Sequence, residues 1–176
     1  LSADDFTHLR LPVDAIVRYL ERGRAAGRRG MNVLLHGRPG TGKTELSRLI
    51  ADQLGVVLRC VSATTEDGEP MSAEQRLQAW RLAQALLSGS TDLLAFDEAQ
   101  DIFPSSPFHA APSSGRKAWM NRMLETNVTP VLWITNDVSS MDTAHLRRFD
   151  LILEMVSPGV SHRRRMARQA LGELPI

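Results

Sequence analysis

Cysteine, excess charge of one sign and long apolar runs are nearly absent from this sequence. Its single cysteine, Cys60, excludes an intrachain disulfide and argues against a cysteine-based metal cluster. We expect Cys60 to be a small buried residue near a strand end, in a reducing compartment that we take to be the cytoplasm. Lys and Arg total 21 and Asp and Glu total 20, which gives a formal net charge of +1. The net charge is therefore too small to attract nucleic acid or a membrane surface electrostatically. No apolar stretch approaches the roughly 20 residues of a membrane helix, and we expect no membrane-spanning segment.

What is present is an alternation of strand-like and helical patterns, within a length of 176 residues that suits one domain. Apolar strand-like runs occupy 32–36, 56–61, 92–96, 130–135 and 150–155. Helical patterns occupy 12–28, 43–54, 73–88 and 115–126. This alternation predicts an α/β domain with a parallel sheet covered on both faces. The three tryptophans, Trp80, Trp119 and Trp133, fall within these patterns, and we expect them in the core.

A glycine-rich segment directly follows the first predicted strand. It reads Gly37-Arg38-Pro39-Gly40-Thr41-Gly42-Lys43-Thr44, which is the phosphate-binding pattern G-x-x-x-x-G-K-[ST]. Glycines let the backbone turn tightly, so that its N–H groups and the following helix N-terminus can surround phosphate oxygens. Lys43 would reach the β- and γ-phosphates, and the Thr44 hydroxyl would ligate Mg²⁺. The segment predicts a nucleoside triphosphate site, and a plain glycine-rich turn is the less favoured alternative.

Two acids follow the third predicted strand, in the run Leu93-Leu94-Ala95-Phe96-Asp97-Glu98. Asp97 would hold Mg²⁺ mostly through water, because Mg²⁺ retains much of its hydration shell. Glu98 would orient and deprotonate an attacking water. Two solvated acids at a strand end are the alternative, which the upstream phosphate-binding segment disfavours.

Three further polar residues are candidates of weaker individual signal. Asn136 follows a predicted strand and could hydrogen-bond the γ-phosphate or the water, although taken alone a turn-forming Asn is the simpler interpretation. Arg147 and Arg148 precede the last strand, and an arginine from a neighbouring molecule can offset the charge that develops during phosphoryl transfer. Taken alone, two solvated surface arginines are the simpler interpretation.

Together these segments resemble the AAA+ ATPases (ATPases associated with diverse cellular activities). The runs 37–44, 93–98, 134–136 and 146–150 occur in the order of that family, and the resemblance extends from about residue 5 to 165. It implies a P-loop NTPase three-layer αβα sandwich, with a five-stranded parallel sheet in the order 5-1-4-3-2 and ATP at its carboxyl edge. It also implies a nucleotide-binding core over 1–157 and the start of a truncated helical lid over 158–176. We expect the chain to be an excised piece of a longer protein.

The resemblance also implies roles and partners. Asn136 would sense the γ-phosphate, and Arg148, or alternatively Arg147, would complete a neighbour's site. The cofactors would be ATP and Mg²⁺, in a homo-oligomeric ring, often a hexamer, that hydrolyses ATP to remodel a protein partner. One departure is the segment 64–72, which lacks the aromatic residue of polypeptide-threading members.

Two alternatives of different class stay open. A nucleic-acid motor or helicase loader would use the basic cluster of 162–165 with Arg168, although a solvated helix face explains that cluster more simply. A non-hydrolysing ATP switch is the other alternative, and the intact pair Asp97 and Glu98 argues against it.

Overall fold

The computed structural model describes residues 6, 9–103, 114–139, 141–157, 159 and 164. Within them one parallel sheet runs in the order β2-β3-β4-β1-β5, which confirms the predicted order read from the opposite edge. Its strands are β1 (Asn32–His36), β2 (Leu58–Val61), β3 (Leu93–Phe96), β4 (Val131–Thr135) and β5 (Leu151–Glu154). Apart from Gly159 and Arg164, the predicted lid and its basic cluster lie outside the described residues.

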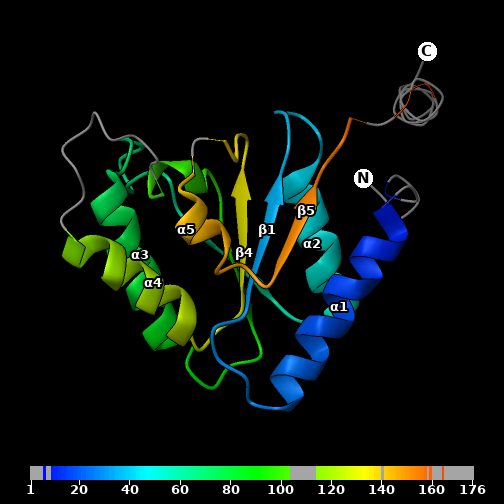
Figure 1. The fold of residues 1–176 in the computed structure, drawn as a ribbon, viewed down its shortest axis with the longest axis horizontal. Helices are drawn as coiled ribbons and strands as arrows, with labels where there is room; N and C mark the ends of the chain where they lie inside the picture. Colours follow the sequence, from blue (N-terminus) through cyan, green and yellow to red (C-terminus); the bar gives the residue numbers. More distant parts are fainter. Residues whose placement is uncertain are drawn as a thin grey trace.

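Helices cover both faces of this sheet, as the α/β prediction requires. Figure 1 shows α1 and α2 on one side, and α3, α4 and α5 on the other. The helices are α1 (Arg10–Ala25), α2 (Lys43–Leu54), α3 (Ala73–Leu86), α4 (Ser114–Thr126) and α5 (Thr143–Leu146), with the 3₁₀ turn η2 (Ala99–Asp101). Among the described residues, no helix is both long enough and apolar enough to cross a membrane.

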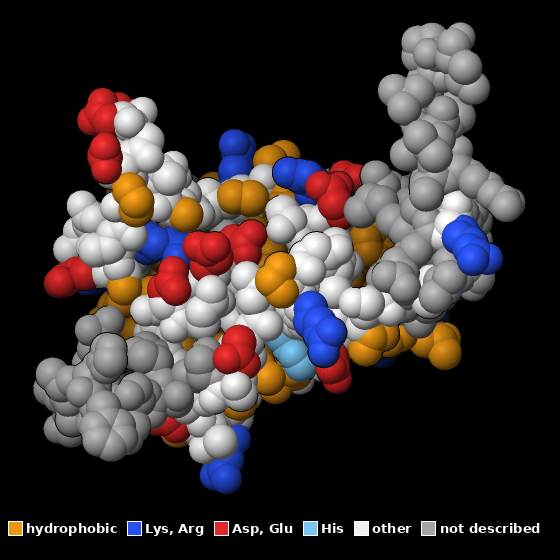
Figure 2. All heavy atoms as spheres, turned by 90° about the horizontal axis from the view of Figure 1, so that it is seen from above, with side chains coloured by type: hydrophobic (Ala, Val, Ile, Leu, Met, Phe, Trp, Pro, Cys, Tyr) orange, Lys and Arg blue, Asp and Glu red, His pale blue; other side chains and the backbone are white. Residues whose placement is uncertain are grey.

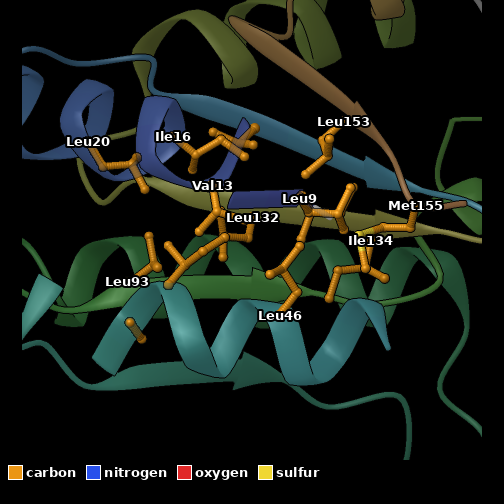
Figure 3. Packing of buried hydrophobic residues seen from close by; sticks show 14 of the residues in the cluster. Leu9, Val13, Ile16, Leu20, Leu46, Leu93, Leu132, Ile134, Leu153 and Met155 are labelled. Atoms are coloured by element: carbon orange, nitrogen blue, oxygen red, sulfur yellow. The ribbon is translucent and has the colours of Figure 1, made fainter. Parts of the chain in front are cut away.

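The face under α1 and α2 is packed almost entirely with aliphatic side chains (Figure 3). Alternate residues of the central strands point to this face, because side chains on a strand alternate with period two. They meet the apolar stripes of the two helices. The members include Val13, Ile16 and Leu20 of α1, Leu46 and Ile50 of α2, and Val33, Leu35, Leu132 and Ile134 of the sheet.

The opposite face is aromatic and contains buried polar groups. The ring of Trp133 lies 5.1 Å from that of Phe96, 5.3 Å from that of Phe103 and 6.1 Å from that of Trp80. The Trp133 indole N–H donates to Asn32 Oδ1 at 2.9 Å, so this large ring has a fixed orientation. The two faces therefore differ in chemistry as well as in the helices that cover them.

Two expectations about single residues are wrong. Cys60 is exposed, because it lies on β2, one of the two edge strands of the described sheet. Trp119 is 36% exposed. It lines an open cavity of about 450 Å³ between α3 and α4, beside Arg81 and Arg122, so helical periodicity placed it in the wrong environment. Trp80 and Trp133 are buried as expected.

Candidate nucleotide site

The glycine-rich segment forms a tight loop between the end of β1 and the start of α2. Gly37 has φ +147°, and a Cβ there would lie 2.3 Å from the carbonyl oxygen of Met155, so only glycine fits. Gly40 and Gly42 also have positive φ, and Gly42 is the N-cap of α2. Pro39, between Gly37 and Gly40, is exposed. The loop therefore wraps the amino end of α2, where unpaired N–H groups and the helix dipole favour anions.

The Lys43 ammonium is enclosed by this loop. The residue is 7% exposed, and Nζ donates to the carbonyl oxygens of Gly37 at 2.7 Å and Arg38 at 3.0 Å. Burial lowers the pKa of Lys43, and the nearby Asp97 carboxylate partly opposes that shift. The Thr41 hydroxyl also donates to Arg38 O, at 2.9 Å. The loop thus holds a desolvated cation whose hydrogen bonds a phosphate could replace.

Thr44 and Asp97 meet at the carboxyl edge of the sheet. Thr44 Oγ1 donates to Asp97 Oδ2 at 3.3 Å, and Asp97 Oδ1 accepts from the N–H of Glu98 at 2.8 Å. Mg²⁺ usually takes only one or two oxygen ligands from a protein, because substrate phosphates and waters complete its coordination shell. The described residues contain no cluster of three or more His, Cys, Asp or Glu that could hold a metal by itself. The donor set fits Mg²⁺ bound together with a nucleotide.

Glu98 has an unusual backbone conformation for its residue type. Its φ of 51° is the only positive value among the described residues other than glycine, and its ψ is 47°. The side chain is exposed next to Asp97. Figure 2 looks onto the edge where the strands end, and acidic side chains gather near the middle of this face. The exposed side chain of Glu98 is accessible from solvent.

Asn136 belongs to the same edge by register. It follows Thr135, which pairs with His36, the residue that precedes the loop. Its side chain is exposed. The neighbouring Thr135 hydroxyl donates to Gln100 Oε1 at 2.7 Å, a contact that the sequence did not suggest. The end of β4 is thereby fixed to η2, directly after Glu98.

The structure does not bring the two candidate arginines to this site. Both side chains are exposed after α5, and Arg148 forms an ion pair with Glu125 of α4. Among the described residues neither arginine forms a hydrogen bond or ion pair with a side chain of the loop or the acid pair, and Arg147 has no ion pair. Both arginines are thus exposed to solvent, and the guanidinium group of Arg148 is engaged with Glu125.

Sequence reasoning missed Arg76, which is 2% exposed beneath the acid pair. A helical pattern treats an arginine as part of a solvated face. The spacing could have predicted its burial. Arg76 precedes the apolar Trp80 by four residues, so the two side chains lie on the same face of α3.

Residues 33–156 match the family described as "ATPase family associated with various cellular activities (AAA)". The chain belongs to this family. ATPase family gene 2 protein homolog B of Mus musculus is 32% identical over 178 residues, which cover 96% of this chain and 23% of that protein. The chain spans less than half the length of the curated relatives that it matches.

Solved structures share the fold of this AAA domain. A chain in the structure of an E. coli MS115-1 HORMA:CdnC:Trip13 complex is 24% identical, with a TM-score of 0.67. That match covers 96% of this chain and 69% of the other. The FIGL-1 AAA domain in complex with ADP is 20% identical with a TM-score of 0.69, over 97% of this chain and 60% of that one.

Proposed function

We propose that this AAA domain binds ATP with Mg²⁺, hydrolyses ATP, and couples hydrolysis to the remodelling of a protein partner in a ring of copies. The observation that carries the proposal is the convergence of Lys43, Thr44 and Asp97 around one loop. The Thr44 hydroxyl lies 3.3 Å from Asp97 Oδ2, and the buried ammonium of Lys43 lies within the loop. The structural neighbour that contains ADP supports nucleotide as the ligand.

Different residues of this chain would perform different parts of the proposed reaction. The loop N–H groups and Lys43 hold the phosphates, and Thr44 with Asp97 holds Mg²⁺. When bound, the ion neutralises negative charge on the phosphate oxygens. Glu98 is exposed beside Asp97, so that it can accept a proton from a water aimed at the γ-phosphate. Asn136 would hydrogen-bond that phosphate from the end of β4.

Completion of the site by a second copy is the remaining part of the proposal. Phosphoryl transfer needs positive charge near the γ-phosphate, and an arginine supplied by another molecule can provide it. Arg148, or alternatively Arg147, is exposed, and among the described residues neither forms a hydrogen bond or ion pair with a side chain of the chain's own loop. A homo-oligomeric ring, often hexameric in such proteins, would bring one of them to a neighbour's nucleotide.

The alternatives receive no support from a described contact. The basic cluster that suggested nucleic acid lies outside the described residues except for Arg164. An exposed glutamate next to the Mg²⁺ ligand favours hydrolysis over a static switch. The protein partner and the cytoplasmic location stay predictions.

The test of hydrolysis compares three variants with the wild-type protein. Glu98→Gln should bind ATP with unchanged affinity while its turnover falls about 10²- to 10⁴-fold, because it cannot accept the proton. Lys43→Ala should lose ATP binding. Glu45→Gln, on the first turn of the same helix and paired with Arg48, is the matched control and should alter neither. ATP binding is measured by calorimetry and turnover by phosphate release.

Either of two results would contradict the proposal. Wild-type turnover in Glu98→Gln would show that another group activates the water. No measurable ATP binding by the wild-type protein would remove the nucleotide site itself.

A further inference from the structure

Arg76 is a buried cation on the underside of the acid pair. It lies on α3, whose start is fixed by a capping box: the Ser72 side chain accepts from the N–H of Gln75, and the Gln75 side chain accepts from the N–H of Ser72. Arg76 follows directly, so its backbone position is well defined. Only 2% of the residue is exposed to solvent.

The guanidinium contacts the chain on both sides of Glu98. Nη2 donates to the carbonyl oxygen of Asp97, and Nη1 lies 3.4 Å from the carbonyl oxygen of Glu98. Nη1 also donates to a carboxylate oxygen of Asp101 at 3.2 Å. The guanidinium carbon lies 4.5 Å from the centre of the Phe96 ring, which orients the group by a cation–π contact.

These two carbonyls determine where the Glu98 side chain points. The carbonyl of Asp97 belongs to the peptide unit before the Glu98 Cα, and the carbonyl of Glu98 belongs to the unit after it. A planar group that binds both therefore fixes both peptide planes and the direction of the Cα–Cβ bond between them. Glu98 needs such support, because a left-handed conformation costs a residue other than glycine about 1–3 kcal/mol.

Stability alone does not explain this arginine. A buried charge is costly, and its replacement by a well-packed apolar side chain is often neutral or stabilising. Among the described residues, Arg76 Nε also has no hydrogen-bond partner. A methionine or leucine would fill the same space against Phe96 without a charge to bury.

We infer that Arg76 is a positioning residue for hydrolysis, which holds the Glu98 backbone so that the carboxylate faces the water at the γ-phosphate. This inference rests on the proposed function. The Arg76 guanidinium binds the backbone carbonyl of Asp97, and among the described residues it forms no hydrogen bond with the Asp97 carboxylate that would hold Mg²⁺. Its removal should therefore impair the chemical step and leave ATP binding intact.

The test uses Arg76→Met and Arg76→Lys in the full protein, with kcat, KM, the ATP Kd and the thermal unfolding midpoint measured for each. Arg76→Met should lower kcat about 10- to 100-fold, because a misplacement of roughly 1 Å can cost about 10²-fold, while KM and Kd stay within about twofold. Arg76→Lys keeps the charge but cannot span both carbonyls, so it should restore only part of the rate. Arg81→Met, on the exposed side of the same helix, is the control and should match the wild type.

The outcomes separate this inference from the proposed function. Wild-type kcat in Arg76→Met, or a loss of ATP binding in step with kcat, overturns the positioning role. If Arg76→Met does not fold, Arg76→Lys decides: full kcat contradicts the role, and reduced kcat with unchanged Kd supports it. A wild-type protein that binds ATP without turnover overturns the proposed hydrolysis, and this inference falls with it.

Discussion

The two faces of the sheet support the nucleotide site in different ways. The face under α1 and α2 is an aliphatic core, and the amino end of α2 supplies Lys43 and Thr44. The face under α3, α4 and α5 is built around Trp133 and contains Arg76, Gln84, Asn127 and His145 as buried polar residues. The first face supports the loop that would bind phosphates. The second supports the acid pair.

This difference between the two faces indicates which side chains must be held in one orientation. Apolar packing is non-directional, so it tolerates exchange among side chains of similar volume. Buried hydrogen bonds specify an orientation, and an unpaired partner is expensive. Asn32 shows this on the aromatic face: its side chain donates to Leu124 O at 2.6 Å and accepts from the Trp133 indole at 2.9 Å. Hydrogen bonds therefore fix side-chain orientations more strictly on the aromatic face than on the aliphatic face.

The largest expected effect is on the aromatic face, at its central ring. Trp133→Ala should lower the free energy of unfolding by about 3–5 kcal/mol, because the residue is fully buried among four other aromatic rings. Ile134→Val, the adjacent residue on the aliphatic face, should cost about 0.5–1.5 kcal/mol. Urea denaturation of both variants measures the difference, and equal losses would remove the contrast between the faces.

A smaller effect should follow from removing single polar groups. Asn32→Leu should cost about 1–3 kcal/mol, because it leaves the Trp133 N–H and the Leu124 carbonyl without partners. Ser47→Ala on α2 is the matched change, since Ser47 is also fully buried but only donates to the carbonyl of Lys43 four residues earlier. It should cost less than about 0.5 kcal/mol. Comparable losses in chemical denaturation would show that buried polar groups serve both faces alike.

The smallest effect concerns pH and Lys43. Burial lowers the pKa of Lys43 in the folded protein below its ordinary value of 10.5. Between the two pKa values the unfolded chain binds more protons, so the free energy of unfolding without nucleotide should rise with pH in that window. Lys43→Met should weaken this rise, as measured by urea denaturation at several alkaline pH values. An unchanged slope in the variant would mean that the ammonium is not desolvated.

The sequence predicted those parts of the fold that depend on one uninterrupted pattern. β1 and α2 have the predicted bounds, because a continuous apolar run, a glycine loop and a helical stripe follow one another without ambiguity. α5 and η2 were missed, since elements this short show no periodicity.

Single-residue environments were harder to predict, because they depend on neighbours distant in sequence. The exposure of Cys60 depends on its strand being at the edge of the sheet, and the burial of Arg76 depends on carbonyls at 97 and 98. The phosphate-binding loop was found because its chemistry is local. The buried guanidinium of Arg76 beneath Glu98 was not predicted, because its hydrogen bonds join α3 to the end of β3, which is distant in sequence.

The most direct test of the whole account is the ATPase rate per molecule as a function of protein concentration, for the wild type, Arg148→Ala and Arg147→Ala. Glu125→Gln, which removes only the ion pair of Arg148, serves as the control. We predict a rate that rises steeply with concentration, falls in at least one arginine variant and persists in the control, because a second copy completes each site. A rate that is absent, or that is independent of concentration and of both arginines, would contradict the account.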